Sequence, residues 1–92
     1  MAVHIVSYDL KAPGRNYDPL WARLREFAFA KPLESFWLID TTMSAAQLRD
    51  DLLKHIDKND RLFVARMAGE SAWSDTISQT VKDWIWQRFP RG

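Results

Sequence analysis

Apolar and polar residues alternate along the first segment of the chain in the pattern of a β-strand. The period of two over residues 3–9 predicts one face with Val3, Ile5 and Ser7 and another with His4, Val6 and Tyr8. The run ends in an aspartate, Asp9. A loop over residues 10–17 is expected next, because this stretch contains a Pro-Gly turn signal.

The first helix is predicted from its start signals. Asp18 is expected to cap its N-terminus, and Pro19 suits the first helical position because its missing amide hydrogen leaves no donor unpaired. We expect this helix to end near Ala30, because Pro32 disfavours helical backbone before it. The predicted buried face consists of Leu20, Leu24, Phe27 and Ala28.

The middle of the chain predicts strands and a second helix. Residues 33–42 have strong β preference and form one bent strand or two short strands broken near Glu34-Ser35; we favour two. Ser44 and Gln47 have the spacing of a capping box, which predicts a helix start. A last core strand is predicted over residues 61–67. The buried stripe of the second helix is Leu48, Leu52 and Ile56.

A third helix is predicted over residues 74–89, capped by Ser74 and ended by Pro90. The resulting order predicts an α+β fold, a ferredoxin-like βαββαβ sandwich with an antiparallel sheet and an additional C-terminal helix. With 92 residues we expect one domain, 1–92, made of a core over 1–67 and the final helix. The apolar stripe of that helix is Ile77, Val81, Trp84 and Ile85.

Three of the predicted strands are apolar on both sides, whereas the first two helices can cover only one face of a sheet. We therefore expect the second face to be covered partly by the last helix and partly by a second copy of the chain.

Charge and composition narrow the classes of partner. The net charge is +1 with both signs interspersed, so a nucleic-acid site would have to come from local placement or from oligomer symmetry. The absence of cysteine excludes disulfides and thiolate metal sites and is compatible with a reducing, cytoplasmic location. The first ten residues do not have the pattern of a signal peptide, and no stretch has the apolar length of a membrane span, so we expect no membrane partner.

The stretch Ser7-Tyr8-Asp9, followed by a helix, by "SFWLIDTTMSAAQLRDDL" and by "DRLFVARM", resembles the CRISPR-associated protein 2 family and its SinR-like relatives. The virulence-associated protein D toxins share that broad group. The likeness covers about residues 3–67. It implies a homodimer of ferredoxin-like subunits with facing sheets, and either metal-dependent phosphodiester cleavage or a non-catalytic DNA-binding role.

In this family the strand-end aspartates of both subunits can share one divalent metal. The resemblance thus implies that Asp9 is the catalytic residue and the ligand of Mg²⁺, because a hard cation relieves the repulsion between two facing carboxylates. The alternative is that Asp9 caps its own loop by accepting hydrogen bonds from amides such as those of Lys11 or Ala12. Lys11 and Arg15 adjoin the candidate metal site, and we expect them to bind phosphate of DNA or RNA.

Three departures from the family pattern bear on function. The loop after Asp9 is longer than the family's usual turn and closer to the SinR-like form, the C-terminus is predicted to be helical where the family commonly adds a strand, and the chain is less basic than a duplex-DNA binder. These departures weaken a role in spacer acquisition more than they weaken the fold.

The two histidines have no partner at metal-ligand spacing. His4 lies roughly 16 Å from Asp9 at strand rise and is expected to be a hydrogen-bonded, partly buried side chain. His55 lies late in the second helix, where a cation suits the helix end.

A second hypothesis from another class stays open: a non-catalytic protein-interaction module. The near-neutral charge and the lack of a second catalytic residue favour it. Trp73, Trp84 and Trp86 could stack on bases, but we expect core or interface packing, with Trp86 the better candidate for an exposed anchor.

Overall fold

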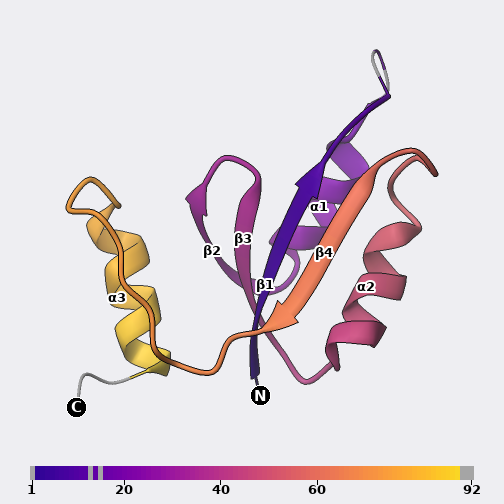
Figure 1. Cartoon of the computed structure of the whole chain (residues 1–92). Helices are drawn as coiled ribbons and strands as arrows, with labels where there is room; N and C mark the ends of the chain where they lie inside the picture. Colours follow the sequence, from indigo (N-terminus) through magenta and orange to yellow (C-terminus); the bar gives the residue numbers. More distant parts are fainter. Residues whose placement is uncertain (1, 13, 15, 90–92) are drawn as a thin grey trace.

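In the computed structural model, residues 2–12, 14 and 16–89 are described. Strands and helices follow one another in the order expected from the sequence (Figure 1). They are β1 (Ala2–Asp9), α1 (Asp18–Arg25), β2 (Ala28–Leu33), β3 (Phe36–Thr41), α2 (Ala45–Leu53), β4 (Arg61–Arg66) and α3 (Gln79–Arg88).

The strands form one four-stranded sheet in the order β2-β3-β1-β4, and every neighbouring pair is antiparallel. β1 lies inside the sheet, paired on one side with β3 and on the other with β4. The α+β class and the antiparallel sheet are therefore confirmed. Within the described residues, no helix has both the length and the apolar character that crossing a membrane requires.

Each face of the sheet carries its own hydrophobic core. α1 and α2 cover one face, whereas α3 lies on the other side of the sheet (Figure 1). The expectation that the last helix covers part of the second face is confirmed. The first core contains Val6, Tyr8, Tyr17, Leu20, Leu24, Trp37, Ile39, Leu48, Leu52 and Ile56. The second, smaller core contains Val3, Ala30, Leu38, Val81 and Ile85.

The prediction that the first helix continues to Ala30 is wrong. α1 ends at Arg25, and Ala28 pairs with Asp40 while Ala30 pairs with Leu38 as part of β2. Strand pairing gives these backbone groups partners that the sequence pattern of a helix does not reveal. Pro32 lies inside β2, where proline is tolerated because β2 is an edge strand.

The start of α1 also differs from the prediction. Tyr17 is the N-cap residue, without a capping side-chain hydrogen bond, and Asp18 is the first helical residue rather than the cap. The Asp18 amide donates to Asn16 Oδ1 at 2.9 Å. An acidic residue in the first turn still suits the positive end of the helix dipole.

Two local signals in the middle of the chain are confirmed. Glu34 and Ser35 form the turn between β2 and β3, so the β-rich region is indeed divided there. The capping box is present: Gln47 N donates to Ser44 Oγ at 3.1 Å, and Ser44 N donates to Gln47 Oε1 at 2.9 Å.

The third helix begins later than predicted, at Gln79 instead of near Ser74. Ser78 is its N-cap: its extended backbone and its Oγ, which accepts from Val81 N at 3.3 Å, start the helix there. Ser74 instead precedes a single turn in which the Ile77 amide donates to the Ser74 carbonyl. Ile77 therefore lies before the helix, while Val81 and Ile85 form its buried side.

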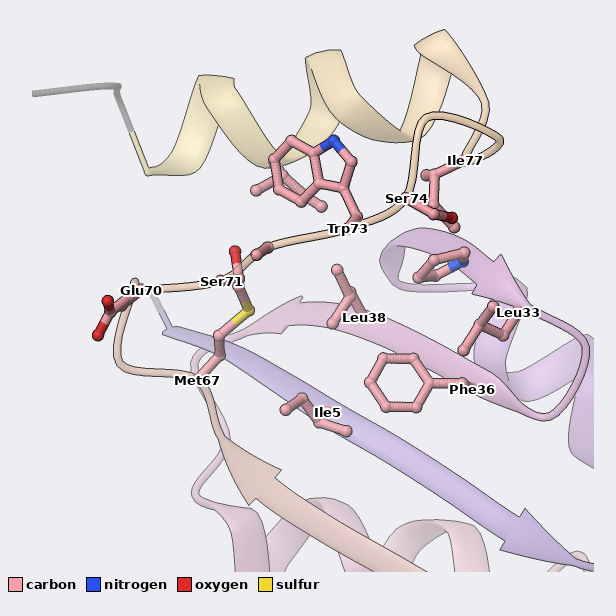
Figure 2. Close-up of a pocket in the computed structure, with 13 residues that line it drawn as sticks. Ile5, Leu33, Phe36, Leu38, Met67, Glu70, Ser71, Trp73, Ser74 and Ile77 are labelled. Atoms are coloured by element: carbon pink, nitrogen blue, oxygen red, sulfur yellow. The ribbon is translucent and has the colours of Figure 1, made fainter.

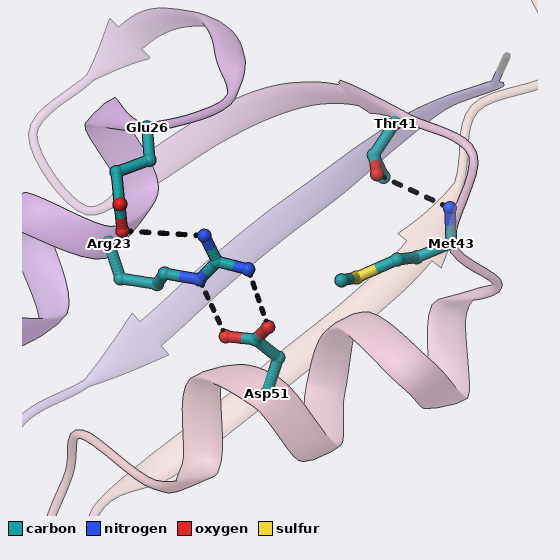
Figure 3. A network of polar contacts seen from close by, with 5 residues as sticks. All are labelled: Arg23, Glu26, Thr41, Met43 and Asp51. Carbon is teal, nitrogen blue, oxygen red and sulfur yellow. Dashed lines mark hydrogen bonds and ion pairs between the residues drawn. The ribbon is translucent and has the colours of Figure 1, made fainter.

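α1 and α2 are joined by a two-bond ion pair between Arg23 and Asp51 (Figure 3). Arg23 Nε and Nη2 donate to the two Asp51 carboxylate oxygens at 2.8 and 2.7 Å, and Nη1 donates to Glu26. These hydrogen bonds lower the pKa of Asp51 below its usual value and raise the pKa of Arg23. The pair links the two helices on the face of the sheet that they cover.

Candidate site at the end of strand β1

Asp9 lies at the C-terminal end of β1, on the face of the sheet opposite to α1 and α2. Val6 and Tyr8 point into the first core, so the alternation along the strand places Asp9 on the face that α1 and α2 do not cover. Its side chain is exposed, and its neighbour on β4 is Arg61. A shallow depression there is lined by Ser7, Tyr8, Asp9, Arg61, Leu62 and Phe63.

Asp9 does not accept hydrogen bonds from the amides of Lys11 and Ala12, the two donors considered for a loop cap. The Lys11 amide donates to Asp60 Oδ1 at 2.6 Å, and the Ala12 amide donates to Tyr17 Oη at 3.2 Å. Within residues 2–12, 14 and 16–89, the Asp9 carboxylate has neither a hydrogen bond nor an ion pair. Asp9 thus has no structural task in the described part of the loop.

Asp60 performs the loop-holding task that the sequence analysis considered for Asp9. The Tyr17 hydroxyl lies 2.8 Å from each Asp60 carboxylate oxygen, and the Asp57 amide donates to Oδ2 at 2.7 Å. Together with the Lys11 amide, these bonds tie the loop after β1 to the turn before β4. Sequence reasoning missed this residue because its partners lie up to 49 residues away.

Two cations neighbour Asp9 within the described residues. Lys11 is exposed two positions along the chain, and Arg61 is exposed directly across the β1–β4 pair. Arg15, the other predicted phosphate-binding residue, lies outside the described residues. Sequence analysis missed Arg61, because its position opposite Asp9 depends on strand register.

The histidines lie apart from this site. His4 is buried on the opposite face of β1, and its Nε2 lies 2.8 Å from the Met43 carbonyl oxygen, as expected for a hydrogen-bonded side chain. His55 lies past the end of α2. No three His, Cys, Asp or Glu side chains of the described residues cluster closely enough to hold a metal ion. Among the described residues that line the depression at the end of β1, Asp9 supplies the carboxylate.

The tryptophans near α3 serve packing. The ring centroids of Trp73 and Trp86 lie 5.7 Å apart at a tilt of 54°, and both side chains are half-buried, which agrees with the expected packing role and not with Trp86 as an exposed anchor. The guanidinium of Arg88 lies 3.8 Å from the centroid of the Trp84 ring and also donates to Asp40 at 2.7 Å. This combination fastens the end of α3 to β3.

Part of the second sheet face remains uncovered by α3. Phe63 on β4 is 67% exposed and Leu33 at the end of β2 is 56% exposed. Ile5 and Phe36 lie between them on the same face, half-buried. Large apolar side chains in this arrangement, next to Asp9 and Arg61, are typical of an interaction surface.

Comparison with known proteins does not assign the chain to a family. No protein-family model matches it, and no solved structure matches it significantly.

Proposed function

We propose that the protein is a nuclease-like, nucleic-acid-binding homodimer of the CRISPR-associated protein 2 type. In this proposal its subunits are ferredoxin-like, and the strand order supports this: read from the other edge it is β4-β1-β3-β2, with a βαββαβ succession. α3 is then an addition to the ferredoxin-like unit.

The uncovered apolar surface supports the homodimer. In an isologous pair, the same patch of both copies is buried, and exposed Phe63 and Leu33 would leave water. Asp9 and Arg61 border this patch, so a two-fold axis near the end of β1 brings both Asp9 side chains together.

The single observation that carries the proposal is that Asp9 is exposed and without a partner in the described residues, while Asp60 and Tyr17 bind the amides of its loop. A carboxylate fixed at a strand end in this way suits Mg²⁺, which prefers oxygen ligands and retains several waters. The donor set fits the metal only when two chains contribute, because each supplies one carboxylate.

Within this site each group has a distinct role. A bound divalent ion would stabilise negative charge on a phosphate or lower the pKa of bound water. Lys11 and Arg61, and Arg15 on the sequence prediction, would bind the flanking phosphates and orient the backbone of the nucleic acid.

Arg61 also favours a second candidate function, the non-catalytic interaction module. If Asp9 of one copy pairs with Arg61 of the other, the carboxylate is neutralised without a metal and serves only to align the dimer. The two candidates share the interface and differ in what Asp9 binds.

Calorimetric titration with Mn²⁺ or Mg²⁺ separates the candidates. We expect saturable binding of one ion per two chains, abolished by Asp9→Asn. The matched control is Asp50→Asn, which removes an exposed carboxylate on α2 that pairs with Arg49 at 2.9 Å and should leave binding unchanged. Equal affinity in the Asp9→Asn variant rules out the metal site.

Nucleic-acid binding is tested separately by filter binding across a salt series. A phosphate-contacting dimer should lose affinity steeply with salt, and Lys11→Gln and Arg61→Gln should each reduce that slope. Absence of binding at low ionic strength, together with an intact dimer, would favour the interaction module.

A further inference from the structure

A cavity of about 380 Å³ lies between the sheet and the segment that leads to α3 (Figure 2). β1 and β3 provide its floor, and Trp73 and Ile77 of residues 67–78 provide its roof. Its volume is within the range of small-molecule sites, and so is its mostly apolar character. Its apolar lining includes Ile5, Leu33, Phe36, Leu38, Trp73 and Ile77.

The roof is held by contacts with α3. The ring of Trp73 packs against Trp86 on α3, and α3 is in turn fastened by the ion pair of Arg88 with Asp40 at 2.7 Å. Val81 and Ile85 anchor the same helix in the second core. Trp73 and Ile77 also pack against the second core, which includes Leu38 of the floor, so the roof has a defined position over the cavity.

The polar groups lie at the rim. Figure 2 shows Ser74 toward one end of the cavity, near Leu33, and Glu70 and Ser71 toward the other end. Among the described residues that line the cavity, Glu70 is the charged one, and no lysine or arginine is included. Such a rim disfavours an anionic ligand such as a fatty acid and favours a cation.

We propose that this cavity binds a small amphiphilic amine, with its apolar ring between Trp73 and the β3 floor and its ammonium group toward Glu70. Two features favour the cation: the negative charge of Glu70, an exposed side chain at the rim, and the presence of the Trp73 indole among the lining residues. The apolar floor of Ile5, Phe36 and Leu38 selects a hydrocarbon body over a sugar or phosphate.

The cavity shares Ile5, Leu33 and Phe36 with the apolar surface assigned to the proposed dimer, so an amine and a second copy of the chain would compete for these side chains, whereas the Asp9 carboxylate itself lies away from the cavity. Ile5 in the cavity floor and Asp9 lie four residues apart on β1, about 13 Å at strand rise. Neither Asp9 nor Arg61 lines the cavity.

Three probes of matched shape test the proposal: 2-phenylethylamine, the neutral 2-phenylethanol and the anionic 3-phenylpropionate. Each is titrated into the full chain while NMR follows the Trp73 indole N–H and the methyl groups of Ile5 and Ile77. We expect saturable shifts with the amine, roughly two to five times weaker binding of the alcohol, and the weakest binding of the anion. Shifts absent from these three residues with every probe, or an anion that binds as tightly as the amine, would overturn the proposal.

Two variants locate the interaction. Glu70→Gln, at an exposed position, should abolish the preference for amine over alcohol, whereas Glu34→Gln, an exposed carboxylate outside the cavity, should preserve it. Ile5→Trp, which fills the floor, should block both probes in a chain that still unfolds cooperatively. An amine preference retained in Glu70→Gln contradicts the charge assignment even if the Ile5 variant does not fold.

Discussion

The two faces of the sheet are built differently. On the face of α1 and α2, leucines such as Leu20 and Leu48 are fully buried, and the indole N–H groups of Trp21 and Trp37 both donate to the Tyr8 hydroxyl at 3.1 and 3.0 Å. On the other face, α3 covers only one part, and the remainder exposes Phe63 beside Asp9, whose carboxylate has no partner in the part of the chain that the structure describes. The first face stabilises the fold, and the second retains surface and charge that folding does not use.

The largest effect on stability is expected from a substitution that leaves a cavity in the first core, beneath α1 and α2. Leu48→Ala removes a side chain with no solvent exposure, so the free energy of unfolding should fall by about 3 kcal/mol. Urea denaturation followed by circular dichroism measures the change. A loss no larger than that of an exposed Leu53→Ala control would contradict the assignment of this core.

The next effect concerns the loop after β1. Asp60→Ala removes an acceptor shared by Tyr17 and the amides of Lys11 and Asp57, and should lower the free energy of unfolding by about 2 kcal/mol. Faster hydrogen exchange at the Lys11 amide should accompany it. Unchanged exchange there would show that Asp60 does not hold the loop.

A smaller, pH-dependent effect is expected from the Arg23–Asp51 pair. Because the folded-state pKa of Asp51 is lowered, the pair stabilises the fold above the unfolded pKa of Asp51, and this contribution is lost as the pH falls through the folded pKa. Asp51→Asn should lower stability by about 1 kcal/mol near neutral pH. The difference from the unsubstituted chain should shrink as the pH falls from neutral through the lowered folded-state pKa of Asp51.

Thermal denaturation of both chains across that pH range measures the difference. A gap that widens toward acid would reverse the sign required by a lowered pKa. Asp50→Asn serves as the comparison, because the Asp50 side chain is more exposed in its pair with Arg49.

The smallest effect on the stability of one chain is expected at Phe63. Its side chain is mostly exposed, so Phe63→Ser should change the unfolding free energy of the monomer by no more than about 0.5 kcal/mol. The same substitution should weaken self-association measured by sedimentation. A dimer unaffected by Phe63→Ser would place the interface elsewhere.

Features determined by neighbouring residues could be predicted from the sequence. The capping box of Ser44 and Gln47 and the turn at Glu34-Ser35 depend on local patterns. The place of the last helix on the second face followed from strands that are apolar on both sides. The boundary between α1 and β2, in contrast, was set by pairing between strands that are distant in the sequence. Ala28 to Ala30 joined a strand because β3 supplies partners.

The candidate site shows the same division. Asp9 was recognisable as a carboxylate at a strand end, but the Lys11 amide of its loop donates instead to Asp60, which is remote in sequence. The position of Arg61 opposite Asp9 is likewise set by the β1–β4 register. A single sequence contains these residues without indicating that they meet.

The proposed proximity of two Asp9 side chains across a dimer is tested most directly by a distance between copies. The chain has no cysteine, so Asp9→Cys provides a single position for a spin label, and Asp50→Cys on α2 provides the comparison. Pulsed electron paramagnetic resonance should find the labels at position 9 close together and those at position 50 far apart. A monomer, or a dimer in which the labels at position 50 are the closer pair, would contradict the account.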